Sequence, residues 1–230
     1  MLFRSLAESV AKDIGAGSFA EVAEVKGTVR CDAPLTSELA NAQCVYYSMH
    51  VTREYEETYW DTDSKGNRVQ KHRRGSETVS QNTRSCPFDV EDATGKVAVD
   101  PSGASLTGEK VYDKFEPGEP GSPAVSIGRW RFDLSSVRLG AGRRTLGYKY
   151  EETIIPVGRP IYVLGEASDA GGKLAVRKPT KKGTSFIVSM KSEEELTRSA
   201  EGSNKGLTIG AAIAAAAGVV VAVLDLLGVI

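Results

Sequence analysis

Residue types that bind metals or carry nucleophilic chemistry are few in this sequence and widely spaced. The 230 residues include three cysteines and two histidines, namely Cys31, Cys44, Cys86, His50 and His72. Zinc sites with local ligands need close pairs such as CxxC, and none occurs. Neither histidine lies in a nucleophile motif such as GxSxG. We therefore expect no catalytic residue, no metal site and no cofactor, and the odd number of thiols argues against a disulfide framework.

Charged residues are numerous but balanced, with 29 Lys and Arg against 30 Asp and Glu. Adjacent carboxylates such as Glu56–Glu57 and Glu151–Glu152 would point to opposite faces of a strand, so we expect most of them to be solvated rather than paired for catalysis. The basic clusters Lys71–Arg74 and Arg143–Arg144 have acidic neighbours, which weakens any attraction for phosphate or acidic lipid. The charge pattern therefore indicates no nucleic-acid partner.

The clearest structural signal is a hairpin in the first half of the chain. Apolar and polar residues alternate from Cys44 to Tyr55, which predicts a half-buried strand. Asp63–Asn67 supplies turn residues, and Ser76–Thr83 predicts a returning strand. The outgoing arm is acidic and the return arm is basic. We expect the two arms to pair across the hairpin, each pair contributing roughly 0.2–1 kcal/mol.

Aromatic and basic side chains gather along this hairpin, and they are the candidate contact surface for a partner. The residues are Tyr55, Tyr59, Trp60, Arg73 and Arg74. The three aromatic residues could also imitate a stacking platform for single-stranded nucleic acid, but packing within a hairpin is commoner. We therefore assign the surface to a protein partner.

Regular short strands separated by Gly-rich turns continue along the chain and predict a mainly β fold. The expected strands are Pro87–Val90, Lys96–Val99, Tyr148–Val157, Ile161–Ala167, Lys173–Arg177 and Ser185–Met190. The proline-rich segment Gly118–Gly128 is expected to be a loop. The pattern is typical of a small OB-like Greek-key barrel or a sandwich, and periodicity alone does not separate the two.

The C-terminal segment predicts a transmembrane helix. Leu207–Leu224 contains no charged residue, and only Asp225 interrupts the apolar run between Gly206 and Ile230. Roughly 20 apolar residues cross the hydrocarbon core of a bilayer as a helix, and this run is long enough. Gly206 and Gly210 form a GxxxG pair, which favours a homo-oligomer through this helix.

The N-terminal segment predicts a short amphipathic helix, because its apolar residues recur every four positions. Its charged residues come too early for a signal peptide. The expected organisation is an N-terminal helix over residues 1–17, a β-rich domain over 18–190, a polar juxtamembrane linker or helix over 191–205 and a transmembrane helix over 206–230. Basic residues near the membrane favour a single-pass protein with a cytoplasmic domain.

Three stretches of the sequence, Lys26–Tyr47, Cys86–Ala104 and Ile154–Ala167, resemble the GIDE domain, also called the beside-a-membrane (BAM) domain. This domain occurs in the membrane-anchored RING E3 ubiquitin ligases of mitochondria and chloroplasts. The resemblance implies a partner-binding domain next to a membrane. The family's RING needs eight Cys or His ligands, whereas this sequence has three Cys and two His. We therefore expect that the RING, and with it ubiquitin-ligase activity, is absent here.

These observations favour a membrane-anchored, non-catalytic binding or scaffolding module with a membrane-associated protein partner. One alternative is a role in ubiquitin transfer through a separate RING subunit. Another is a barrel that binds a lipid or small ligand at the membrane, which would need an apolar cavity of at least roughly 300 Å³.

Overall fold

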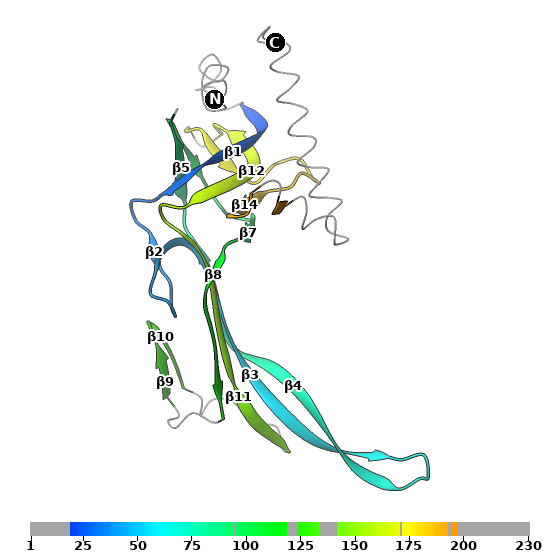
Figure 1. Ribbon diagram of the computed structural model, residues 1–230. Helices are drawn as coiled ribbons and strands as arrows, with labels where there is room; N and C mark the ends of the chain where they lie inside the picture. The colour runs from blue at the N-terminus through cyan, green and yellow to red at the C-terminus, as the bar shows by residue number, and fades with distance from the viewer. Residues whose placement is uncertain are drawn as a thin grey trace. The chain divides into compact units, whose positions relative to one another are not determined.

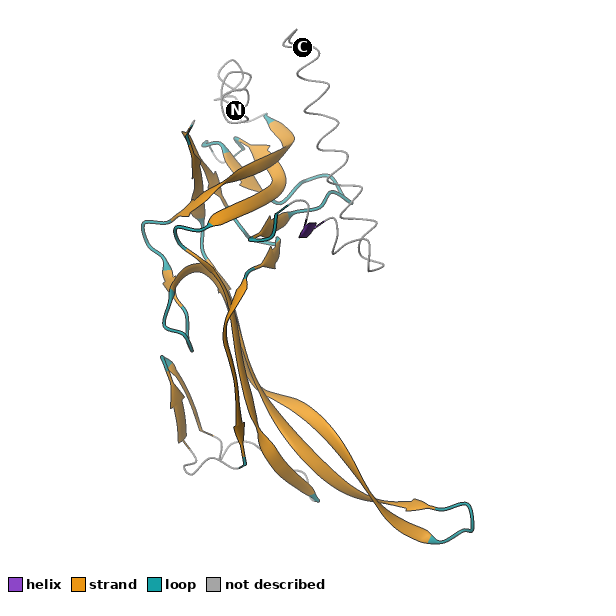
Figure 2. Ribbon diagram, in the orientation of Figure 1, coloured by secondary structure: helices purple, strands orange, loops and turns teal. Residues whose placement is uncertain are grey.

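The computed structural model describes residues 19–93, 95–118, 124–133, 142–170, 172–192 and 195–196. Strands dominate these residues, which divide into two compact units (Figures 1 and 2). The expected helices over 1–17 and 206–230, and most of the segment 191–205, lie outside the described residues. Within the described ranges, no helix combines the length and the apolar character that crossing a bilayer requires.

The first unit contains the described residues up to Leu35, Ser85–Gly108, and the described residues from Ile155 onward. Its sheet has the order β1-β5-β6-β13-β12-β14-β7, and β12 also pairs with β1. That pairing closes β1, β5, β6, β13 and β12 into a five-stranded barrel. The strands are β1 (Ala20–Arg30), β5 (Phe88–Asp92), β6 (Gly95–Val99), β7 (Ser105–Thr107), β12 (Pro160–Ser168), β13 (Ala175–Arg177) and β14 (Ile187–Ser189).

The barrel confirms the predicted β class and decides between the two architectures that the sequence left open. β1 runs antiparallel to both β5 and β12, while β6 and β13 are parallel. Branched aliphatic side chains, at most 1% exposed, fill the core: Val29, Val90, Val99, Val163, Val176 and Val188. Such residues are stiff and pack well on a pleated surface. The eight residues of β12 after Pro160 are all buried, as expected for a strand covered on both faces.

Gly165 lies on β12 at a position with no room for a side chain. A Cβ atom there would lie 2.8 Å from a methyl carbon of Val176 and 2.9 Å from the ring of Phe186. Both neighbours are buried, so neither can move into solvent. We expect Gly165→Ala to lower the free energy of unfolding by about 1–3 kcal/mol through overpacking.

Chemical denaturation of the purified protein checks this prediction. The matched control is Ala98→Val, which adds carbon atoms at an exposed position of β6 in the same barrel. Equal effects of the two substitutions would contradict the tight packing that we ascribe to Gly165.

The second unit contains Thr36–Arg84 and Glu109–Ile154, so the chain enters it twice. Its main sheet has the order β2-β3-β11-β8, and β4 pairs with β3. A separate two-stranded sheet joins β9 to β10. The strands are β2 (Leu35–Thr36), β3 (Gln43–Thr62), β4 (Arg68–Ser85), β8 (Glu109–Pro117), β9 (Ala124–Ile127), β10 (Trp130–Asp133) and β11 (Arg143–Pro156).

The alternating segment from Cys44 to Tyr55 forms a strand, as predicted. Val45, Met49 and Val51 are at most 1% exposed, whereas His50 on the opposite face is exposed. The predicted returning strand is also present, although β4 is longer than the pattern indicated. The alternation thus correctly identified the face of β3 that packs into the core.

The prediction of a loop over Gly118–Gly128 is wrong for its last part, because Ala124–Ile127 forms β9 and pairs with β10. Gly128 allows the tight turn between them, with φ of +57°. Trp130 anchors this small hairpin. Its ring stacks on Phe132 at 5.6 Å and meets Tyr150 edge-on at 5.9 Å, and its indole N–H donates to Ser80 Oγ at 3.1 Å.

Candidate interaction surface

The turn that joins β3 to β4 is held by one aspartate. The backbone N–H groups of Lys65 and Asn67 both donate to Asp63 Oδ1 at 2.8 Å. The Asp63 N–H in turn donates to the Asn67 carbonyl at 2.9 Å. The hydrogen bonds from Asn67 hold the pKa of the Asp63 carboxyl below its usual value. The predicted turn is therefore confirmed, and its backbone is fixed by local hydrogen bonds.

Contacts across the hairpin show which side chains share a face. Arg73 Nη2 lies 2.6 Å from Glu57 Oε2, and a Cβ on Gly75 would contact the Tyr55 ring. Because alternate residues of a strand share a face, Tyr55, Tyr59 and Arg73 lie on one side of the hairpin. Trp60 and Arg74 fall on the other. The candidate residues thus divide between the two faces of the hairpin.

Ion pairs between the arms confirm the predicted charge pairing. Glu57 accepts from Arg73 and, at 3.3 Å, from Arg143 Nε. Lys71 Nζ lies 2.6 Å from Asp61 Oδ2. The hydrogen bonds from Arg73 and from Lys71 lower the pKa values of the Glu57 and Asp61 carboxyls respectively. Lys71 and Arg73 on the return arm are therefore already paired with carboxylates within the hairpin.

Tyr55 is held in the interior of this charge network. Its ring lies 4.5 Å from Arg143 Cζ and 5.6 Å from Arg53 Cζ. Arg53 is buried, and it donates to Glu77 at 2.7 Å and to Thr145 at 2.8 Å. Tyr55 is thus half-buried and close to two guanidinium groups, which favours a structural role for this side chain.

Two aromatic side chains near the turn are exposed. Tyr59 is 36% exposed and Trp60 is 60% exposed. The Arg73 guanidinium lies 5.5 Å from the Tyr59 ring, and that of Arg68 lies 5.3 Å from the Trp60 ring. Each face of the hairpin therefore presents one aromatic ring stacked with one arginine. We refer to Tyr59, Trp60, Arg68 and Arg73 as the tip patch.

The tip patch lies on a part of the hairpin that extends past its neighbouring strand. The Thr58 N–H donates to the carbonyl of Gly142 at 3.2 Å, just before β11 begins. Figure 1 shows β3 and β4 continuing past the point where β11 begins, as a two-stranded ribbon. Such a ribbon leaves both of its faces accessible to a partner.

Glu152 is a buried carboxylate that sequence reasoning misplaced, because it was expected to be solvated. It is 0% exposed and accepts three backbone N–H groups. The N–H groups of Glu38 and Leu39 donate to Oε1 at 2.8 and 3.0 Å, and that of Ala40 donates to Oε2 at 2.8 Å. Its role is to fix the loop before β3, and no local signal reveals this because the donors are more than a hundred residues away in sequence.

The family of the chain follows from comparison of its sequence with known families. The model of the GIDE family, described as E3 ubiquitin ligase, matches residues 56–223, which is more than half of the chain. The chain belongs to the GIDE family. The match includes the whole tip patch and Glu152.

One relative of this GIDE chain is the E3 ubiquitin-protein ligase SPL1 of Arabidopsis thaliana. The two are 32% identical over 114 residues, which is 46% of this chain and 30% of SPL1. The GIDE chain therefore matches less than a third of its relative's length. No solved structure matches it significantly.

The GIDE chain shows no metal-binding constellation in the ranges that the structure describes. No group of three or more His, Cys, Asp or Glu side chains there is arranged to hold a metal ion. None of the three cysteines forms a disulfide. Of the two histidines, His50 is exposed on β3, and His72 Nδ1 lies 3.1 Å from Thr58 Oγ1 on the hairpin.

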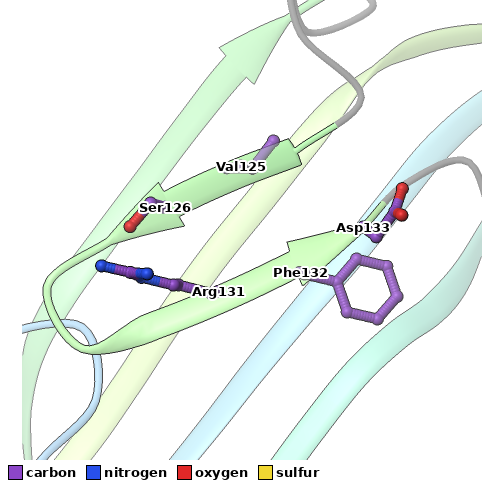
Figure 3. Close-up of a pocket in the computed structure, with 5 residues that line it drawn as sticks. All are labelled: Val125, Ser126, Arg131, Phe132 and Asp133. Carbon is purple, nitrogen blue, oxygen red and sulfur yellow. The ribbon is translucent and has the colours of Figure 1, made fainter.

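A hollow of about 430 Å³ lies against the β9–β10 hairpin of the GIDE chain. Figure 3 shows its lining residues: Val125, Ser126, Arg131, Phe132 and Asp133. Arg131 is opposite Ser126, and Phe132 is opposite Val125. The hollow is larger than the threshold for a small ligand, but charged side chains line it and it lies outside the barrel. It differs from the apolar barrel cavity that a lipid site was expected to need.

Proposed function

We propose that this GIDE chain is a membrane-tethered, non-catalytic binding or scaffolding module, and that the tip patch binds a membrane-associated protein. The observation that carries the proposal is Trp60, which is 60% exposed at the end of a braced hairpin. Tryptophan, tyrosine and arginine dominate the energetics of protein interfaces. The tip patch consists of these residue types alone.

The bracing of the hairpin supports this role. The Asp63 turn and the Arg73–Glu57 ion pair fix the arms before any partner arrives. A preorganised surface loses less conformational entropy on binding than a flexible one. The hairpin is therefore suited to bind as a rigid element.

The same charge pairing favours a protein over a nucleic acid as the partner. Binding to a phosphate backbone relies on cations that displace counterions, and here Arg73 and Lys71 already have carboxylate partners. In chain order, the barrel strands are arranged 1-2-3-5-4, with the fourth closing on the first. We propose that the barrel is OB-like, used here as the scaffold that carries the hairpin.

Tethering by residues 206–230 completes the proposal. A domain held at a membrane by a single span meets membrane partners at a raised effective concentration, so weak contacts suffice. Basic charges flanking the span favour the cytoplasmic side for the domain.

Replacing Trp60 by Ala is expected to reduce capture of the partner at least tenfold, because an interface hot spot contributes about 2 kcal/mol. Folding should be unaffected since the side chain is exposed. The measurement is affinity purification of the full chain from native membranes, with quantitative mass spectrometry of the proteins recovered. Arg73→Ala is expected to weaken capture as well.

Ser64→Ala is the matched control, because Ser64 is exposed in the same turn and lies outside the tip patch. Proteins recovered with the wild type and with Ser64→Ala, but depleted with Trp60→Ala, are the expected partners. Recovery of the same proteins in the same amounts with the wild type, Ser64→Ala and Trp60→Ala would reject the tip patch as the contact surface.

A role in ubiquitin transfer through a separate RING subunit is the second candidate. The description of the matched family and the name of the Arabidopsis relative favour it. The purified chain, with ubiquitin-activating and ubiquitin-conjugating enzymes, would then support transfer only when a RING subunit is added. No effect of the chain on the RING subunit's transfer rate would reject this candidate.

A further inference from the structure

Two cysteines that are distant in sequence lie in contact in the first unit. Cys31 Sγ is 4.0 Å from Cys86 Sγ, and both side chains are half-buried. Cys31 directly follows the last residue of β1, and Cys86 lies just before β5. The antiparallel pairing of β1 with β5, in which Arg30 is opposite Asp89, brings the two positions together.

We propose that Cys31 and Cys86 form a reversible disulfide, which makes this thiol pair an oxidation site of the protein. The reduced sulfur atoms already touch, and a disulfide forms when side-chain rotation brings them to about 2.05 Å. Cys31 Sγ also lies 3.6 Å from the carbonyl of Pro87, so the thiol is directed toward the start of β5. Cys44 is 0% exposed and serves as an internal reference.

The reaction is thiol–disulfide exchange with a small disulfide such as glutathione disulfide. The thiolate of one cysteine attacks a glutathione sulfur, forms a mixed disulfide and releases one glutathione thiolate. The second cysteine thiolate then attacks the protein sulfur of the mixed disulfide and releases the second glutathione. Two electrons pass from the two protein sulfurs to glutathione, and the two thiol protons end on the released glutathione or in solvent.

The position of the pair gives the disulfide a consequence for the rest of the chain. The segment Thr36–Arg84, which carries β3, β4 and the tip patch, leaves the first unit after Cys31 and returns just before Cys86. The disulfide closes a covalent loop around that entire segment. Cross-links that close long loops restrict the unfolded chain most.

The test uses the full chain in detergent, equilibrated with millimolar glutathione disulfide and then alkylated. We expect intact-mass spectra to show the loss of two hydrogen atoms, with at least about tenfold more internal disulfide than glutathione adduct on Cys31 because the second thiol is held in contact. Digestion at glutamate separates Cys31 from Cys44, since Glu38 lies between them, and identifies the linked peptides.

The Cys86→Ser variant should instead accumulate the glutathione adduct on Cys31, while Cys44→Ser should form the internal disulfide as the wild type does. Equal glutathione adduct on Cys31 in the wild type and in Cys86→Ser would overturn the proposal. Loss of the internal disulfide in Cys44→Ser would also overturn the proposal, because the disulfide would then involve Cys44.

Discussion

Arginine at positions 215 and 219 is expected to move the full chain from the membrane pellet to the supernatant. Ala215 and Val219 lie in the middle of the apolar run at the C-terminus. Each arginine at the centre of a transmembrane helix costs about 2.5–3.5 kcal/mol, so two of them disfavour insertion by more than roughly a thousandfold. Fractionation of lysed cells by ultracentrifugation, followed by carbonate extraction of the pellet, measures the distribution.

The control for this redistribution is Ser203→Arg, which adds an arginine outside the apolar run. It should leave the chain in the membrane fraction. A double-arginine variant that stays in the carbonate-washed pellet, or a wild-type chain that stays in the supernatant, would contradict the tether.

Glu152→Ala is expected to lower the free energy of unfolding of the second unit by about 3 kcal/mol. The substitution leaves three backbone N–H groups without their acceptor, among them the buried N–H of Leu39. An unsatisfied buried donor costs about 1–3 kcal/mol, and hydrogen bonds to a charged acceptor are stronger than neutral ones. Solvent-accessible donors of the loop recover part of this loss.

Tryptophan fluorescence measures this effect in a Trp60→Phe background. Trp130, the second of the two tryptophans, is 6% exposed in the core of the second unit and then reports its unfolding alone. Glu151→Ala is the matched control, since Glu151 is the neighbouring residue and pairs at the surface with Lys110 and Lys149. It should cost less than about 1 kcal/mol. Equal losses for the two variants would show that the buried carboxylate is unimportant.

Local periodicity predicted the longest strand, β3, because its buried and less buried residues alternate. The alternation from Val45 to Val51 reports which face is buried, and the turn at Asp63 is encoded by its own side chain. β9 was missed for the opposite reason. Its four residues become a strand only through pairing with β10 and through the contact of Trp130 with Tyr150, neither of which is visible locally.

The candidate site shows the same division between local and distant information. The sequence identified the aromatic and basic residues of the hairpin, but not that Tyr55 would be enclosed by Arg53 and Arg143, because Arg143 belongs to a distant strand. The burial of Glu152 and the contact between Cys31 and Cys86 also depend on pairs far apart in the chain. Such contacts arise from topology, and composition or spacing does not encode them.

Photo-crosslinking at the hairpin tip is the most direct measurement of partner binding. A photoreactive amino acid replaces Ser64, which is exposed in the turn beside the tip patch, in the full chain in native membranes, and a second variant carries it at Lys181, which is exposed in the first unit. We predict a discrete adduct with a membrane-associated protein from position 64 and none of that mass from position 181. Adducts that are absent at position 64, or the same at both positions, would contradict a partner-binding hairpin.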